Sequence, residues 1–111
     1  MPRIDSILQL VQAQGASDLH LVSGTPPMLR IHGDLQPIEY EPLTSEVIVG
    51  LLAEIMTEEQ MARYQGLEEV DFAYEADGIG RFRVNVYRQQ GTVALAIRYV
   101  LPTVPSLAEL G

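Results

Sequence analysis

The strongest restriction on the fold is a set of alternating apolar side chains in the last third of the chain. Apolar residues recur at every second position in three runs, at residues 70–74, 82–86 and 93–99. Because successive side chains of a β-strand point to opposite faces, each run gives a strand with one apolar face. Asp77 with Gly78 and Gln90 with Gly91 separate the runs, and such short turns join antiparallel strands. The pattern predicts three antiparallel strands with one buried face.

The N-terminal part predicts a helix followed by three strands. Apolar residues from Ile4 to Val11 follow i, i+3, i+4, i+7 spacing, so we expect an amphipathic helix over residues 3–14. Pro37 indicates a sheet edge or a bulge, and Gly33 with Asp34 is expected to form the turn before the strand that contains it. Alternation and turn residues place these three strands at residues 18–22, 28–32 and 35–40.

Two helices are expected between the two groups of strands. Thr44 can cap the first, and Thr57 with Gln60 has the spacing of a capping box for a shorter second helix that ends near Gly66. The order helix, strands, helices, strands predicts an α+β domain, with an antiparallel sheet of about six strands and helices packed on one face.

Arginine is the only basic residue type of this acidic chain. The formal net charge is −8, which argues against a nucleic-acid binder. Ten acidic residues lie in the segment 41–80, whereas the segment 81–98 holds four arginines and no acid. Because guanidinium groups match phosphate oxygens, this local excess of arginine predicts an anion site in an otherwise acidic protein.

The candidate anion ligands are Arg81, Arg83 and Arg98. Arg81 and Arg83 are two residues apart on one predicted strand, and Arg98 is expected on the same face of a neighbouring strand. An alternative is that these arginines pair with the acidic segment, for example with Glu75 or Asp71. Composition alone favours the ion pairs, so both interpretations stay open at this point.

Each of the two histidines lies two residues from an aspartate, a pattern that can bind a metal ion. We nevertheless predict no metal site. Asp18 with His20 and His32 with Asp34 each share one strand face. Two histidines without cysteine are a weak zinc signal, and the chain has no cysteine. We expect the two aspartates to bond nearby backbone amides, and Asp18, His20 and Arg30 to lie at an interface.

Several segments together resemble the opening of the type IV pilus retraction ATPases of the PilT type and their type II secretion relatives. They are ASDLHL at 16–21, GTPPMLRIHGDL at 24–35, GRFRVNV at 80–86, IRY at 97–99 and VPSLAELG at 104–111. The resemblance implies a PAS-like N-terminal domain at residues 1–100, joined to a RecA-like ATPase domain in a homo-hexamer. It also implies that Arg81 and Arg98, and less strongly Arg83, approach the phosphates of ATP with Mg in the cleft between the domains.

The chain departs from the complete family because it has no G-x-x-x-x-G-K-[ST] loop. It contains no lysine at all, so no phosphate-binding loop of this type is possible. We therefore expect no ATP hydrolysis by this chain alone, although the resemblance implies that the complete protein is an ATPase whose hydrolysis drives pilus retraction. Its expected partners are its own and neighbouring ATPase domains and the inner-membrane platform protein of the pilus.

Residues 101–111 are expected to form a linker and the start of the next helix. Leu101, Pro102 and Pro105 predict a stiff hinge, and Ser106 with Glu109 has capping-box spacing two residues before the sequence stops. We expect a cytoplasmic protein that works at the inner face of the cytoplasmic membrane. The alternative function is a stand-alone PAS-like ligand-sensing or protein-interaction module. It is disfavoured because the predicted interior is filled by apolar residues, with no polar side chain expected inside.

Overall fold

A computed structural model describes residues 3–64 and 69–100 and gives the helices and strands in the predicted order. The helices are α1 (Arg3–Ala13), α2 (Ser45–Ala53) and α3 (Glu58–Tyr64). The strands are β1 (Asp18–Leu21), β2 (Met28–Ile31), β3 (Asp34–Pro37), β4 (Val70–Ala76), β5 (Gly80–Gln89) and β6 (Thr92–Val100).

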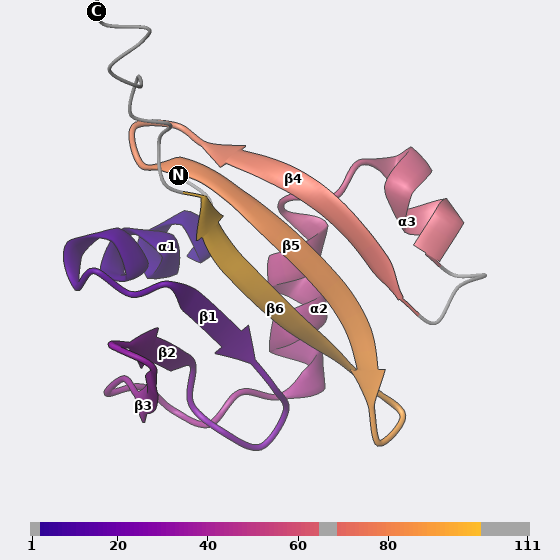
Figure 1. Ribbon diagram of the computed structural model, residues 1–111. Coiled ribbons are helices and arrows are strands. Elements are labelled where there is room, and N and C mark those ends of the chain that lie inside the picture. Colours follow the sequence, from indigo (N-terminus) through magenta and orange to yellow (C-terminus); the bar gives the residue numbers. More distant parts are fainter. Residues whose placement is uncertain (1–2, 65–68, 101–111) are drawn as a thin grey trace, which may run out of the picture.

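The strands form one antiparallel sheet in the order β3-β2-β1-β6-β5-β4. The pairing of β1 with β6 joins the N-terminal strands to the C-terminal three, although about eighty residues separate them in the chain. Figure 1 shows the helices on one side of the sheet, with α2 crossing behind β5 and β6. The predicted α+β class with helices on one face is confirmed.

Local sequence signals account for the ends of the helices. The Thr44 side chain accepts a hydrogen bond from the Val47 amide at 3.2 Å and so caps α2. At α3, the Gln60 amide donates to the Thr57 hydroxyl at 3.1 Å, while the Thr57 amide donates to the Gln60 side chain at 2.9 Å. Both bonds of the predicted capping box are present, so two N–H groups without helical partners are satisfied.

The hairpin between β2 and β3 turns one residue earlier than predicted. His32 was expected inside the second strand, but its φ is 52° and that of Gly33 is 85°. Two successive positive φ angles are typical of a tight type I′ hairpin, which matches the twist of the flanking strands. The third strand covers Asp34–Pro37 instead of residues 35–40. Beyond it the Ile38 amide still donates to the Pro27 carbonyl at 3.0 Å, but Pro27 has no N–H to return a bond and continue the ladder.

The core lies between the helices and the inner face of the sheet. Phe82, Val84 and Ile97 are 0–2% exposed and meet the apolar face of α1 and α2. The expectation of an interior without polar side chains is wrong at Asp5, which is 4% exposed. Its carboxylate accepts a hydrogen bond of 2.7 Å from the Tyr74 hydroxyl, so a bonded partner offsets the cost of burying it.

No helix in the described ranges is long and apolar enough to cross a membrane. The opposite face of the sheet carries the alternate residues of every strand, and the three described helices leave it open. This open face is where the predicted arginines lie.

Candidate functional site

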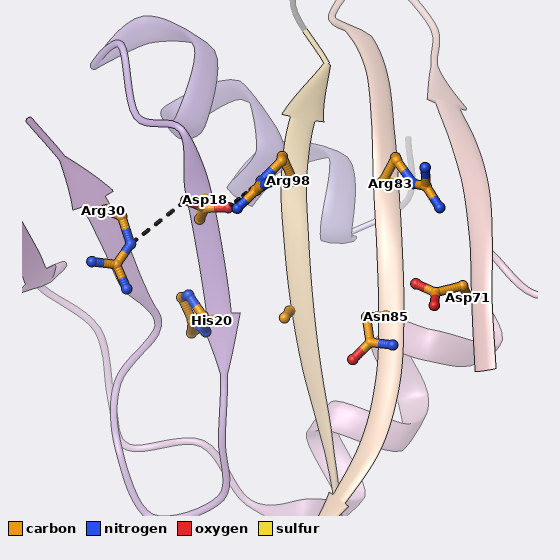
Figure 2. Close-up of a pocket in the computed structure, with 8 residues that line it drawn as sticks. Asp18, His20, Arg30, Asp71, Arg83, Asn85 and Arg98 are labelled. Carbon is orange, nitrogen blue, oxygen red and sulfur yellow. Dashed lines mark hydrogen bonds and ion pairs between the residues drawn. The ribbon is translucent and has the colours of Figure 1, made fainter. Parts of the chain in front are cut away.

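A row of charged side chains crosses the open face along four neighbouring strands. In the strand register Arg30 lies opposite Asp18, Asp18 opposite Arg98, and Arg98 opposite Arg83. The row therefore runs from β2 through β1 and β6 to β5, and neighbouring strands are about 4.8 Å apart. Figure 2 shows Asp18 between Arg30 and Arg98. Three arginines and one carboxylate thus share a single line.

Asp18 is the fixed member of this row. It is 9% exposed, and its two carboxylate oxygens take different partners. Oδ1 accepts a 3.1 Å hydrogen bond from Nε of Arg98. Oδ2 accepts a 2.8 Å bond from the Ser17 hydroxyl and lies 3.6 Å from Nε of Arg30. The expectation that Asp18 bonds backbone amides is wrong, because its partners are side chains.

Opposing influences act on the pKa of Asp18. Burial opposes the charged form, but the Ser17 hydroxyl and the Arg98 guanidinium outweigh it, so the pKa of Asp18 lies below its ordinary value. Asp18 is therefore a carboxylate at neutral pH. A carboxylate held in this way gives the row a permanent internal negative charge.

Arg81 and Arg83 do not form the ion pairs that composition favoured. The register places Glu75 opposite Arg81 and Asp71 opposite Asn85, yet no ion pair joins either arginine to a carboxylate within residues 3–64 and 69–100. The acid that does pair with a candidate arginine is Asp18, on β1. No sequence pattern indicates this contact, because Asp18 and Arg98 are 80 residues apart.

A hollow of about 410 Å³ lies beside the row of charges. Its floor includes Ala96, a small residue between longer polar side chains, and this difference in size leaves the space. Arg83 and Arg98 line it, whereas Arg81 is not among its lining residues. The full lining is Asp18, His20, Arg30, Asp71, Arg83, Asn85, Ala96 and Arg98. Figure 2 shows that these side chains come from β1, β2 and β4–β6. The structure thus brings Arg83 and Arg98 together with all three expected interface residues.

His20 lines this hollow, and its pKa is shifted by the groups around it. Burial lowers the pKa of His20 below 6.5 and the positive charge of Arg30 adds to this effect, while Asp18 acts in the opposite direction. The imidazole is therefore neutral at pH 7. Within the described residues, no group of three or more metal-ligating side chains is present.

We expect the free energy of unfolding to fall as the pH drops below 6.5, in part because of His20. The unfolded chain binds a proton to His20 more readily than the folded chain, so acid favours unfolding. Urea unfolding of wild type and His20→Gln between pH 7 and pH 5 measures this contribution. The variant should lose less stability over that interval than wild type, and parallel losses would contradict the pKa shift.

Curated proteins with similar sequences share the whole length of this chain. The type IV pilus retraction ATPase PilT of Pseudomonas aeruginosa is 37% identical over 108 residues, which span 97% of this chain and 31% of PilT. PilU of the same organism, a type IV pilus ATPase, is 33% identical over 96% of this chain and 28% of PilU. No protein-family model matches.

Solved structures agree with this result. The pilus retraction motor PilT with bound ADP has a TM-score of 0.81 and 36% identity, covering 95% of this chain and 32% of that chain. The chain belongs with the N-terminal domains of PilT-type ATPases. The ATPase DotB of Legionella pneumophila, with a TM-score of 0.76 and 23% identity over 93% of this chain and 29% of its own, supports the fold alone.

This PilT-type domain spans about a third of the length of the relatives that it matches. The candidate hinge residues Leu101, Pro102 and Pro105 lie outside the described residues. The division between residues 1–100 and 101–111 therefore stays a prediction. The site that the structure describes consists of the row of charges and the hollow beside it.

Proposed function

We propose that this domain supplies arginines to the phosphate groups of ATP bound with Mg by a RecA-like ATPase domain of the complete protein. The observation that carries the proposal is the direct cross-strand pairing of Arg83 with Arg98. Like charges directly opposite each other on a sheet are unfavourable. An anion that bridges the two guanidinium groups would remove this cost and would form charge-assisted hydrogen bonds with both.

The geometry ranks the three candidate arginines. Arg83 and Arg98 line the same hollow, so one phosphate chain can reach both. Arg81 lies on the same face but pairs with Val100, two residue pairs along the ladder from the Arg83–Arg98 pair. We therefore assign Arg98 and Arg83 to direct phosphate contact and Arg81 to the margin of the site, where it adds positive charge.

In the proposed assembly, the ATPase domain binds to the same open face of the sheet. Asp18, His20 and Arg30 would contact an ATPase domain that closes over the open sheet, in the same subunit or a neighbouring one of a homo-hexamer. Residues 101–105 would act as the hinge, so that nucleotide state changes the angle between domains. The complete protein would work at the cytoplasmic face of the membrane, where it would contact the platform protein of the pilus.

Replacing the arginines in the complete protein tests this function. Arg83→Ala and Arg98→Ala should each lower kcat/KM for ATP by about 10- to 100-fold, the range expected when one hydrogen bond to a charged group is lost. Arg81→Ala should have a smaller effect. The steady-state ATPase rate of purified hexamers, together with pilus retraction in cells, provides the measurement.

Arg88→Ala is the matched control for these variants. Arg88 belongs to the same strand and is exposed, but it is not among the residues that line the hollow shared by Arg83 and Arg98. Its replacement should leave ATPase kinetics close to wild type. Wild-type kinetics in both Arg83→Ala and Arg98→Ala would refute the phosphate role.

A stand-alone ligand sensor is the competing function. A sensor of the PAS-like kind binds its ligand between the sheet and the helices, but here that space holds side chains such as Leu8, Leu52 and Phe82, all at most 1% exposed. The charged hollow lies on the opposite, open face. Calorimetry that detects a small molecule bound among these core residues would favour the sensor.

A further inference from the structure

An internal anion already occupies the arginine that is best placed for a phosphate. The Asp18 carboxylate binds Nε of Arg98 and lies beside Nε of Arg30. A phosphate that approaches Arg98 therefore meets the negative charge of Asp18. It is repelled at close range unless it replaces Asp18 as the partner of the guanidinium. The consequence for binding depends on which of the two groups can move.

Arg98 is the group that can move, and Asp18 is the one that is held. The Arg98 side chain is 73% exposed, whereas that of Asp18 is 13% exposed. Asp18 lies on β1 between two paired strands and is bonded to the Ser17 hydroxyl at 2.8 Å. A long exposed arginine changes rotamer at small cost, while a carboxylate packed within the sheet does not.

Asp18 also has a second cation that remains if Arg98 leaves. Nε of Arg30 lies 3.6 Å from Oδ2, and Nη1 of Arg30 donates a 2.9 Å hydrogen bond to the Gly33 carbonyl, which fixes this arginine at its place. A buried carboxylate without a partner is costly. Because Arg30 stays, the release of Arg98 does not leave Asp18 in that state.

We infer that Asp18 is an internal counter-anion, and that a phosphate group must displace it from Arg98 before the phosphate can bind at the site. This inference rests on the proposed function and adds its regulation: the open face holds phosphate weakly on its own, because Asp18 keeps Arg98 occupied. A polyphosphate is the ligand class that can compete, since it offers oxygens to Arg83 and Arg98 together, whereas a single small anion engages one guanidinium at a time.

Tripolyphosphate titrated into the chain, followed by calorimetry at low salt, tests the inference. Asp18→Asn keeps the size and the acceptor oxygen but removes the charge, and it should bind tripolyphosphate about tenfold more tightly than wild type. Asp71→Asn is the control, because it removes the same charge from the lining of the same hollow without touching Arg98. It should gain no more than about twofold to threefold, as expected for an exposed charge.

An NMR experiment on the wild-type chain does not depend on the folding of a variant. The Nε–H signal of Arg98 should shift on saturation with tripolyphosphate, because its acceptor changes from carboxylate to phosphate. Nε of Arg3, which binds Glu54 at 3.3 Å, serves as an internal reference and should stay in place. ATP used as a second probe should give the same order of affinities among the variants.

Equal gains in Asp18→Asn and Asp71→Asn would overturn the inference, because the effect would then come from net charge alone. An unshifted Arg98 signal at saturation, absence of binding in wild type and both variants, or a different order with ATP would overturn it as well. None of these results bears on the proposed function, which is decided separately by the ATPase kinetics of the arginine variants in the complete protein.

Discussion

Gly80→Ala should lower the free energy of unfolding by about 3 kcal/mol, the largest effect expected of an added methyl group at any glycine that the structure describes. Gly80 begins β5 with a φ of 149°, a conformation that residues with a side chain rarely adopt. A Cβ placed there would lie 2.8 Å from Cε1 of Tyr99. Backbone strain and steric overlap therefore act together at this one position.

The Tyr99 ring cannot easily move away from an added methyl group. It stacks on Phe82, with ring centroids 5.0 Å apart, and Phe82 is fully buried. The Tyr99 amide also donates a 3.0 Å hydrogen bond to the Ser17 carbonyl. Because Ser17 and Tyr99 flank Asp18 and Arg98, relief of the overlap would disturb the charged row on the other face.

Gly78→Ala separates the two causes. Gly78 also has a positive φ, at 75°, but nothing lies within 4 Å of an added Cβ. This variant should lose only the backbone contribution, about 1–2 kcal/mol. Urea unfolding of the two variants at pH 7 gives the comparison. Equal losses would show that the overlap with Tyr99 is relieved at no cost and would contradict the prediction for Gly80.

The sequence predicts the faces of the sheet well, because each face depends only on alternation along one strand. Phe82 and Ile97 are buried as expected, and Arg83 and Arg98 point to the open face. Helix starts at Thr44 and Thr57 are equally local, since the cap and its bonded amide are three residues apart. Information of this kind lies within a few neighbouring residues.

The partners of the site residues depend on contacts that are distant in the chain. Arg98 lies opposite Asp18 and Arg83 only because β6 pairs with both β1 and β5 in a particular register. A shift of one residue would place Asp18 opposite an inward-facing side chain. The acid that pairs with Arg98 is Asp18 for this reason. Proximity in sequence and shared composition do not specify which strands become neighbours.

Asp5 shows the same limit inside the core. Its position in the first turn of α1 is typical of an acidic residue that stabilises a helix start from solvent. The structure instead buries it, because β4 places the Tyr74 hydroxyl 2.7 Å from its Oδ1. These two residues are 69 positions apart. A buried acid with one distant partner could not be recognised from helical spacing.

Tyr74→Phe should lower the free energy of unfolding by about 1–3 kcal/mol, because it leaves a buried carboxylate without its hydroxyl donor. Asp5 is 4% exposed, so water cannot replace the bond freely. Tyr87→Phe is the matched control, since Tyr87 lies on the open face and forms no hydrogen bond among the described side chains. It should change stability by less than about 0.5 kcal/mol. Similar losses in both variants would mean that the Asp5 bond contributes little.

The Tyr74–Asp5 pair also predicts that the free energy of unfolding falls in alkali. Burial and then the hydrogen bond to Asp5 raise the pKa of Tyr74 from 10.0 to about 12. The folded chain therefore holds this proton at a pH where the unfolded chain releases it, so stability falls as the pH rises from 10 through 12. Urea unfolding between pH 9 and pH 12 should show this decline in wild type, and Tyr74→Phe should lack the part due to Tyr74. An equal decline in the variant would show that another group causes the alkaline transition. It would contradict the conclusion that ionisation of the Tyr74 phenol weakens the contact between α1 and β4.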